Sequence, residues 1–335
     1  MHWLQHHWYH TTKLQLILFP ISLVFRALVA LRWMLYRDGA LSSDRLMLPV
    51  IVVGNISVGG TGKTPLTLAL AQQLVERGWH PLIISRGYGG AARHPQCVSI
   101  SGDAQQVGDE PLLMAQRNIC PVWVGRDRVA TAHAALKAHP QCDVVLCDDG
   151  LQHYRLQRDF EIAVVDAERG FGNGRMLPAG PLREPLSRLQ TVDAVVMHGG
   201  ASEVGLFTMH LSGEVFYNLL DPARKAVPTD FQQSKVHAVA GIGHPDRFFR
   251  HLEALGISFT PHAFPDHHPY SASDLAFADP AFAKWDALLM TEKDAVKCTA
   301  FADARYWALR VDAQIDPALI DHILRKIAPH GLQTA

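Results

Sequence analysis

The chain has 335 residues, a formal net charge of −1 and 48% hydrophobic residues. This length suffices for two domains of ordinary size, and the hydrophobic content argues against extensive disorder. The near-neutral balance gives no indication of nucleic-acid binding, and no feature indicates an obligate protein partner. The five cysteines lack the spacing of a zinc or redox motif, which indicates reduced thiols in a cytosolic protein.

The first predicted element is a strongly apolar helix from Leu14 to Arg37, which we assign to an N-terminal segment of residues 1–38. Its longest uncharged stretch, Leu14 to Phe25, is too short to span a bilayer comfortably. Four polar residues recur at intervals close to whole helical turns and share one stripe: Gln15, Ser22, Arg26 and Arg37. This pattern predicts an amphipathic helix in the membrane interface, and the alternative is a core helix packed on a sheet.

After this helix, short apolar segments alternate with helical ones. Such alternation indicates a mostly parallel sheet with helices on both faces, and we assign residues 39–204 to an α/β domain of this kind. The predicted strands are Val50–Val53, Pro81–Ser85, Pro121–Val124, Val144–Cys147, Ile162–Asp166 and Asp193–Met197, and the clearest helices are Thr64–Arg77 and Arg126–Ala138.

The second half of the chain is organised differently. Two apolar runs around Ser212 and Gly213 predict a β-hairpin, which together with the turn-rich stretch after it makes a linker over residues 205–230. Strand and helix signals then resume and end with a helix near Pro317 to Ala328. We therefore expect a second, smaller α/β domain over residues 231–335.

The stretch GNISVGGTGKTP, Gly54 to Pro65, lies between an apolar strand and a helix. In this context a P-loop directs backbone N–H groups and a helix N-terminus at phosphate oxygens, whereas the alternative is a glycine-rich turn without a ligand. Lys63 is placed to reach the outer phosphates, and the Thr64 hydroxyl to bind Mg²⁺. The strict pattern has glycine at position 57, where this chain has serine. The predicted nucleotide-binding residues are Ser57, Val58, Gly59, Gly60, Thr61, Gly62, Lys63 and Thr64.

The stretch VVLCDDGLQH, Val144 to His153, has the form of a Walker B element, an apolar strand that ends in carboxylates. Asp148 and Asp149 would hold Mg²⁺ directly or through water. Two adjacent acids at the end of a buried strand are unfavourable unless a cation compensates them, which argues against the alternative of a solvated turn.

Kinases, motor ATPases and GTPase switches all contain a P-loop. Only the residues that would contact a phosphate acceptor can distinguish a kinase from the other two classes. A kinase needs a group that accepts the acceptor's proton, and the candidates are Asp109 with Glu110, and the loop residues Asp266, His267 and His268. Taken singly, Asp109 is equally explained as a helix N-cap and His267 as a surface histidine. The residues alone favour a Mg-ATP-dependent phosphotransferase with a membrane-facing helix and leave its acceptor open. A nucleotide-gated switch is the alternative from another class.

Taken together, the motifs resemble the tetraacyldisaccharide 4'-kinase family, the P-loop kinases of lipid A biosynthesis. The stretches that carry the resemblance run in order from Val53 to Cys298: VGNISVGGTGKTP, SRGYGG, GDEPLLMA, DDGLQHYRLQRDFEI, FGNGRMLPAGPLREP, GIGHPDRFF, PDHHPY and MTEKDAVKC. The combination is specific and covers nearly the whole chain, and the non-glycine at position 57 is shared by the family.

The resemblance implies ATP-dependent phosphorylation, with Mg²⁺, of the 4'-hydroxyl of an acylated glucosamine disaccharide 1-phosphate at the cytoplasmic face of the inner membrane. It implies Asp109 as the catalytic base paired with His267, which requires the two domains to approach each other. Further roles follow from the same resemblance: Asp148, Asp149 and Glu184 around the metal, and Arg183 and His153 at the phosphates. The stretch TEKD, Thr291 to Asp294, has no assigned role beyond its occurrence in the family, and the alternative is that it only braces the second domain. A kinase for another acceptor remains the nearest alternative.

Overall fold

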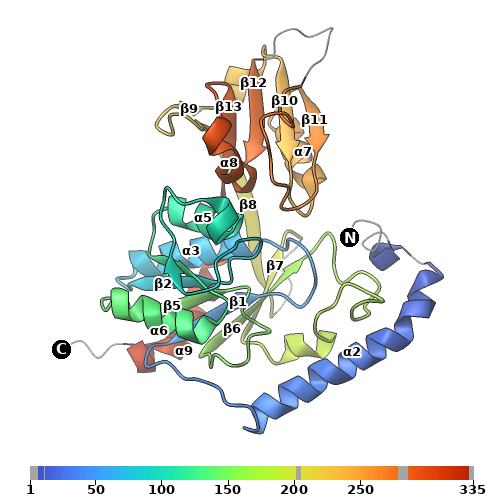
Figure 1. The fold of residues 1–335 in the computed structure, drawn as a ribbon, viewed down its shortest axis with the longest axis vertical. Helices are drawn as coiled ribbons and strands as arrows, with labels where there is room; N and C mark the ends of the chain where they lie inside the picture. The colour runs from blue at the N-terminus through green and yellow to red at the C-terminus, as the bar shows by residue number, and fades with distance from the viewer. Residues whose placement is uncertain (1–6, 11, 201–204, 278–285, 332–335) are drawn as a thin grey trace.

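The computed structural model describes residues 7–10, 12–200, 205–277 and 286–331. Within these residues the strands form one continuous sheet of thirteen strands, which runs through a larger and a smaller α/β body (Figure 1). The smaller body stands above the larger one in this view, and helix α2 runs along the lower margin. The predicted α/β class with a mostly parallel sheet is confirmed.

The larger body is built on a parallel sheet of order β7-β6-β1-β5-β2-β4, with β3 added antiparallel at its edge. Strands β1, β2, β5 and β6 are buried along their whole length, as expected for strands covered on both faces. The bounds are β1 Val50–Gly54, β2 Pro81–Ser85, β3 Gln96–Cys97, β4 Val122–Val124, β5 Val144–Asp148, β6 Phe160–Asp166 and β7 Ala194–His198.

Helices cover both faces of this sheet. Successive residues of each strand point to opposite sides, and those on both sides are apolar and buried. Ile51 and Val53 pack with residues of α3, α5 and α9, whereas Val50 and Val52 pack with residues of α6. The helices are α3 Lys63–Glu76, α4 Ala104–Val107, α5 Asp109–Gln116, α6 Arg128–Ala138 and α9 Pro317–Gly331, with a 3₁₀ turn at Leu186–Gln190.

Helix α9 belongs to the larger body, whereas the sequence analysis placed its residues in the second domain. Leu319, Ile320, Ile323 and Ile327 lie in the same buried cluster as Leu66 of α3. The pattern of the helix shows that one face is buried, but it does not show against which sheet. The chain therefore leaves the larger body and returns to it, and the smaller body is an insertion between β8 and α9.

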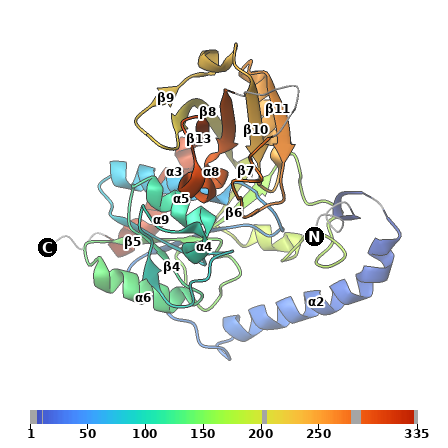
Figure 2. The same ribbon diagram turned by 45° about the horizontal axis from the view of Figure 1, so that its top comes forward.

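The smaller body contains four parallel strands in the order β11-β10-β12-β13. Its core gathers aromatic side chains, among them Phe216, Phe231 and Trp307. Helix α8 contacts α5 of the larger body, and the two lie side by side in Figures 1 and 2. The bounds are β10 Val236–Ala240, α7 Pro245–Ala254, β11 Phe259–Ala263, β12 Ala287–Thr291, α8 Glu292–Cys298 and β13 Tyr306–Ile315, with 3₁₀ turns at Pro228–Phe231 and Thr299–Phe301.

The two bodies are joined by β8, Phe207–Asn218, which is one strand rather than the predicted hairpin. It pairs in parallel with β7 of the larger body and antiparallel with β13. A side chain at Gly213 would meet the carbonyl oxygen of Arg310 at 2.2 Å, beside a register shift between Arg310 and Asp312. The glycine therefore marks an irregularity in a ladder and not a turn. The turn lies later, at residues 219–224, and leads to β9, Lys225–Ala226. Residues 201–204, at the predicted domain boundary, lie outside the described residues.

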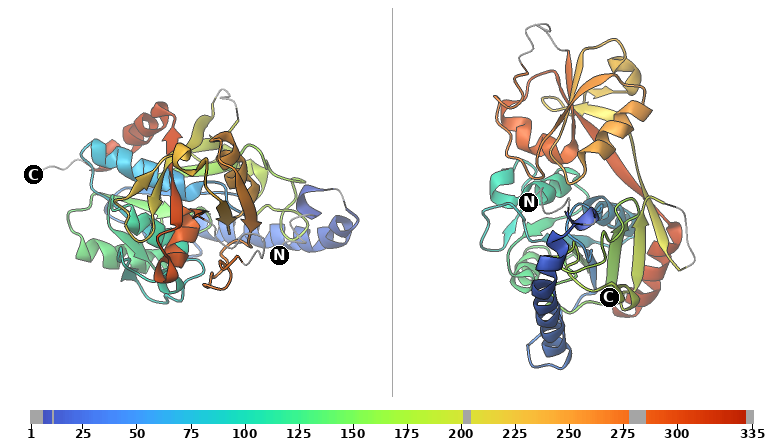
Figure 3. Two further views of the ribbon diagram at one scale, coloured as in Figure 1. Left: turned by 90° about the horizontal axis from the view of Figure 1, so that it is seen from above. Right: turned by 90° about the vertical axis from the view of Figure 1, so that its right-hand side faces the viewer.

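Helix α2, Leu14–Arg37, lies at the margin of the larger body and extends beyond it (Figure 3). Two residues of the predicted polar stripe face the protein: Gln15 and Ser22 are buried, and Ser22 Oγ donates to the carbonyl of Met176 at 2.7 Å. Phe25 and Val29 pack on the same part of the body. The exposed surface of the helix is consequently apolar, with Leu16, Ile17, Ile21, Val24 and Leu28 each more than half exposed. By length and composition alone the helix could cross a membrane, which corrects the length argument made from its uncharged stretch.

Candidate active site

The P-loop connects β1 to α3 and is shaped for a bound anion. Gly62, with φ of +92°, begins α3, and a side chain there would meet His198 Nδ1 at 2.9 Å. Asn55 spans the loop by donating from Nδ2 to Thr61 Oγ1 at 3.1 Å. Gly243 of the smaller body approaches the same loop so closely that a Cβ on it would lie 3.0 Å from the Gly60 nitrogen. Glycine at these positions keeps the backbone N–H groups accessible to phosphate oxygens.

The first residues of the loop, which were predicted to bind the nucleotide, contact another segment of the chain. The Val58 N–H donates to the Pro181 carbonyl at 2.9 Å, and Ser57 forms an isolated β-bridge with Leu182. Because the Val58 N–H already has an acceptor, it is not available to a phosphate in this conformation. Ser57 and Val58 thus fix the loop to the segment that carries Arg183, and the anion-facing part is residues 59–64.

Lys63 and Arg183 converge on Asp149. Lys63 Nζ lies 3.5 Å from Asp149 Oδ1, and Arg183 lies 3.3 Å from both carboxylate oxygens. Burial opposes the charged form of Asp149, but the two cations outweigh burial and lower its pKa to about 2. Asp149 has a φ of +47°, which turns its side chain away from the direction that a regular strand would give it. The three residues place two cations and one anion at the mouth of the P-loop.

Asp148 precedes Asp149 and has the opposite environment. Its carboxylate is buried, and it accepts only long hydrogen bonds, from Thr67 Oγ1 at 3.4 Å and Ser85 Oγ at 3.3 Å. Burial, followed by the charges of Glu110 and Asp149, raises the pKa of Asp148 to about 7. A carboxylate in such a position is suited to binding a cation.

The described residues contain no group of three or more His, Cys, Asp and Glu side chains that could hold a metal ion by themselves. Mg²⁺ in nucleotide sites is commonly held by one or two carboxylates together with substrate phosphates, so Asp148 and Thr64 fit such an ion only when a nucleotide completes the site.

Glu184 lies in a closed network and not at an open position for a metal. Its oxygens accept from Gln152 Nε2 at 2.6 Å, Tyr154 OH at 2.7 Å and Arg188 Nε at 3.2 Å, and the residue is 2% exposed. Gln152 also donates to the Asn55 carbonyl at 2.9 Å. These contacts anchor residues 150–154 beneath the P-loop, and the place of Glu184 at the metal stays a prediction.

His153 does not supply positive charge at neutral pH. Burial, and then the charge of Arg128, lowers the pKa of His153 to about 4. Its Nε2 is buried and has no hydrogen-bond partner among the described residues. The contribution of His153 to phosphate or transition-state charge stays a prediction.

Asp109 and His267 meet across the boundary between the two bodies, as the family resemblance implied. His267 Nδ1 lies 2.9 Å from Asp109 Oδ2 and 3.2 Å from Oδ1. The N-cap of α5 is Gly108, so the explanation of Asp109 as an N-cap does not apply. Burial works to raise the pKa of Asp109, but the hydrogen bond with His267 and the charge of Lys293 lower it overall. Burial works to lower the pKa of His267, and the hydrogen bond with Asp109 raises it overall.

Lys293 completes this cluster and was missed in the sequence. Its Nζ lies 3.0 Å from Glu110 Oε1, 3.1 Å from Asp266 Oδ1 and 3.4 Å from His267 Nε2. The lysine is the third residue of TEKD, whose Thr291 caps α8 and so fixes the start of the helix that carries Lys293. The sequence offered one signal for Lys293, which is that the TEKD stretch is among those that carry the family resemblance. The residues that contact Lys293 are distant in the sequence, so the signal did not reveal its place in the site.

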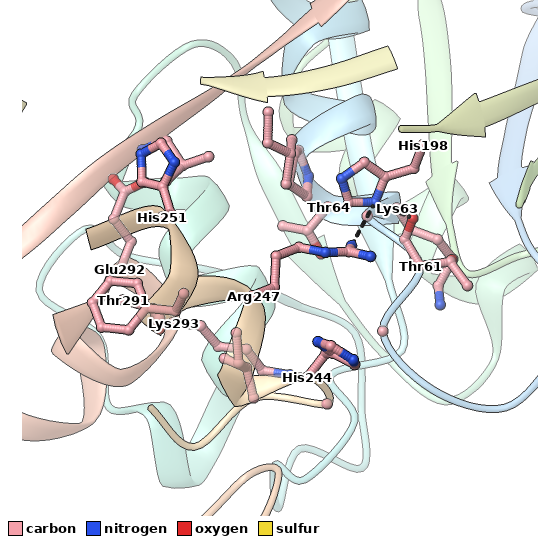
Figure 4. A pocket seen from close by; sticks show the side chains of 18 of the residues that line it. Thr61, Lys63, Thr64, His198, His244, Arg247, His251, Thr291, Glu292 and Lys293 are labelled. Atoms are coloured by element: carbon pink, nitrogen blue, oxygen red, sulfur yellow. Dashed lines mark hydrogen bonds between the residues drawn. The ribbon is translucent and has the colours of Figure 1, made fainter. Parts of the chain in front are cut away.

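A cavity of about 660 Å³ lies between the two bodies, beside the P-loop. Lys63 and Thr64 line one side, Lys293 lines another, and Arg247 of α7 extends into it (Figure 4). Arg247 donates to Asp166 at 2.9 Å and lies 3.2 Å from His198 Nδ1, so it links the bodies on the side away from Asp109. The size of the cavity and its phosphate-binding wall suit a nucleotide.

Comparison with known proteins agrees with this geometry. A model of the family described as tetraacyldisaccharide-1-P 4'-kinase matches residues 14–328. The chain belongs to this family. The tetraacyldisaccharide 4'-kinase of Methylobacillus flagellatus is 50% identical over 325 residues, which cover 97% of this chain and 96% of that protein. The kinase of Azoarcus sp. is 52% identical over 322 residues, covering 94% of this chain and 92% of the relative.

A solved structure of a family member has the same fold. The crystal structure is described as an apo form of LpxK from Aquifex aeolicus in complex with ATP. It matches with a TM-score of 0.77 and 30% identity, and the match covers 94% of this chain and 99% of the other. The membership in the 4'-kinase family that was predicted from the ordered motifs is confirmed, and with it the enzyme class.

Proposed function

We propose that this chain transfers the γ-phosphoryl group of Mg-ATP to the 4'-hydroxyl of a tetraacylated glucosamine disaccharide 1-phosphate. The family supplies the reaction, and the observation that carries the proposal is the pairing of Asp109 with His267 beside a nucleotide-sized cavity. A nucleotide-gated switch needs no such pair, which favours the kinase over this alternative. A P-loop kinase for another acceptor is disfavoured by the exposed apolar surface of α2, for which a soluble acceptor gives no reason.

The chain's own residues divide the work between phosphate binding and proton transfer. The backbone of residues 59–64 and the Lys63 ammonium hold the phosphates, and Arg183 adds a second cation near them. Asp148 and Thr64 are the residues that would hold Mg²⁺, which supplies charge neutralisation at the phosphates when bound. Asp109 accepts the proton of the attacking hydroxyl, and His267 orients the carboxylate and shares the charge.

We further propose that α2 attaches the enzyme to the cytoplasmic face of the inner membrane, where an acylated substrate resides. The helix contacts the body along its length, at Ser22, Phe25 and Val29 and again where Tyr36 meets Tyr154 at 6.0 Å between ring centroids. A helix held along one side cannot be surrounded by lipid unless the body enters the bilayer as well. An interfacial position therefore fits better than a transmembrane one, and Arg26 and Arg37 would contact anionic headgroups.

The kinase reaction is tested by incubating the purified protein with radiolabelled ATP and a detergent-solubilised acylated disaccharide 1-phosphate. We expect label in the lipid phase, dependent on both the acceptor and Mg²⁺. Slow release of inorganic phosphate without acceptor-dependent transfer would instead support a switch. Transfer to a deacylated soluble disaccharide with equal efficiency would refute the lipid acceptor.

The membrane attachment is tested by placing glutamate at Ile17, Val24 and Leu28, which are 71%, 61% and 59% exposed. We expect loss of binding to anionic phospholipid vesicles and lower activity on vesicle-borne substrate, with ATP binding retained. Leu220→Glu, at a residue 58% exposed in the smaller body, is the matched control. Point changes are preferable to deleting residues 1–37, since deletion would also uncover the apolar cluster around Ile56. Unchanged vesicle flotation of the triple variant would contradict the proposal.

A further inference from the structure

The pair Asp109–His267 can act in two ways, and the distances around His267 Nε2 distinguish between them. If Nε2 were free, the imidazole could take the acceptor's proton there while Asp109 orients the other nitrogen. Here Nε2 faces the Lys293 ammonium at 3.4 Å, whereas its other polar neighbour, Asp266 Oδ1, is 3.8 Å away. An ammonium group has donors only, so this contact requires a lone pair on Nε2.

The consequence is a defined position for the imidazole proton. With Nε2 accepting, the proton of the neutral ring lies on Nδ1, from which it is donated to Asp109 at 2.9 Å. The carboxylate then carries the basic lone pairs of the pair. We propose that Lys293 is a positioning residue that holds His267 in this tautomer and thereby makes Asp109, and not His267, the acceptor of the hydroxyl proton. The proposal rests on the kinase function proposed above.

Lys293 is held firmly enough to serve this purpose. Its side chain is 16% exposed and forms ion pairs with Glu110 of the larger body at 3.0 Å and Asp266 of the smaller body at 3.1 Å. It lies at the start of α8, which packs against α5, the helix that begins with Asp109. Lys293, Asp266 and His267 all belong to the smaller body, and the ion pair with Glu110 adds a contact to the larger body. The lysine that sets the tautomer therefore also contributes to the docking of the two bodies.

The charged and titratable groups that face this cluster come from four elements. They are Asp109 and Glu110 of α5, Lys293 and Lys297 of α8, Asp266 of the loop that carries His267, and Tyr88, whose ring centroid lies 5.2 Å from that of His267. Lys293 lowers the pKa of Asp109 and that of His267. Its removal makes it easier to add a proton to the pair, whichever member receives it.

The test is Lys293→Met, which keeps the length of the side chain and removes the charge. We expect kcat to fall about 10- to 100-fold at neutral pH, the lower part of the range for proton-transfer groups. Since the active form lacks the extra proton, the acid limb of the kcat profile should move to higher pH. Lys293→Arg should recover part of kcat and return the limb toward the wild-type position. An unchanged limb, or a rise in the KM for ATP without a fall in kcat, would overturn the proposal.

Two further variants separate positioning from a general loss of contacts. Lys293→Met with Glu110→Gln removes the stranded carboxylate, and we expect it not to recover activity; full recovery would attribute the defect to Glu110 and overturn the proposal. Arg250→Met removes a cation that joins the bodies elsewhere, at Glu168, and should leave the pH profile unchanged. The wild-type protein in the same assay reports on the kinase function itself, so failure of that function is distinguishable.

The tautomer can also be observed directly. In protein with ¹⁵N-labelled histidine, the signals of His267 are assigned by their loss in His267→Gln. We expect a non-protonated nitrogen at Nε2 in the wild type, with a mixture of tautomers or an imidazolium in Lys293→Met. A protonated Nε2 in the wild type would refute the proposal.

Discussion

Two pairs of adjacent carboxylates meet at this site, and the protein compensates their charges in opposite ways. In the pair that begins α5, each carboxylate has a cationic or hydrogen-bonding partner from the smaller body: His267 for Asp109 and Lys293 for Glu110. The pKa of Asp109 is accordingly lowered although its carboxylate is buried. This pair is complete without a ligand, but only while the two bodies are docked.

In the pair that ends β5, the compensation is one-sided. Asp149 forms ion pairs with Lys63 and Arg183, whereas Asp148 accepts from the hydroxyls of Thr67 and Ser85. The charges of Lys63 and Arg128 lower the pKa of Asp148 by less than burial, Glu110 and Asp149 raise it. The environments of the two pairs therefore distinguish a carboxylate suited to proton transfer from one suited to cation binding. We expect Asp109, which pairs with a histidine, to take part in proton transfer, and the buried Asp148, whose pKa is raised, to bind a cation.

The largest effect should follow from removing the compensated acid. Asp109→Ala should lower kcat by about 10²- to 10⁴-fold, the usual contribution of a proton-transfer group. ATP affinity, measured by titration calorimetry, should stay near the wild-type value because Asp109 makes no contact with the P-loop. Asp103→Ala, which removes an exposed acid that only caps α4, is the control. Loss of ATP binding in Asp109→Ala would show that both carboxylate pairs contribute to nucleotide binding and would contradict the difference in role between them.

A smaller and opposite effect on stability should follow from neutralising the uncompensated acid. The folded-state pKa of Asp148 is raised, so its charge destabilises the fold above pH 7, and this penalty disappears below the ordinary pKa near 4. Asp148→Asn should therefore raise the melting temperature of the ligand-free protein by a few degrees at pH 8 and hardly at all at pH 4. At the same time it should weaken the dependence of activity on Mg²⁺. A lower melting temperature of the variant than of wild type at pH 8 would contradict the claim that the charge of Asp148 destabilises the ligand-free fold.

The smallest effect should follow from Glu110, which links the two pairs. Glu110 is a partner of Lys293 and also raises the pKa of Asp148. Glu110→Gln should lower kcat less than about tenfold, since Asp266 continues to hold the lysine. It should also let Asp148 ionise at lower pH, and Mg²⁺-dependent turnover would then extend to lower pH. A loss as large as that of Asp109→Ala would remove the distinction between the two acids of this pair.

The parts of the site that could be predicted from the sequence are those in which the local pattern carries the chemistry. The P-loop and the Asp148–Asp149 pair each follow a predicted strand of a parallel sheet, and the carboxyl ends of such strands meet at one edge. The pairing of Asp109 with His267 came from the family resemblance, because the two residues lie in different bodies. Lys293 was missed for the same reason: its partners, Glu110 and Asp266, are far away in the sequence.

The remaining differences concern which surface an element meets. The polar stripe of α2 showed that its faces differ, but Gln15 and Ser22 turned out to face the protein. The periodicity of α9 likewise did not show that it packs against the first sheet. Ser212 and Gly213 have the composition of a turn, and only the nearby Arg310 carbonyl explains why a glycine is required there. The sequence likewise did not show that Gln152, Tyr154 and Arg188 donate to the oxygens of Glu184.

The course of β8 and β13 has a consequence for how His267 reaches Asp109. Both connections between the bodies run through this one antiparallel ladder, with Gly213 opposite its irregular point. The segment between Ser212 and Asp312 is thus an insertion into the strand pairing of the larger body. Joining these two residues directly would leave the pairing of the larger body uninterrupted. The inserted segment carries both His267 and Lys293. If the smaller body moves, these two side chains therefore move together relative to the P-loop, which belongs to the larger body.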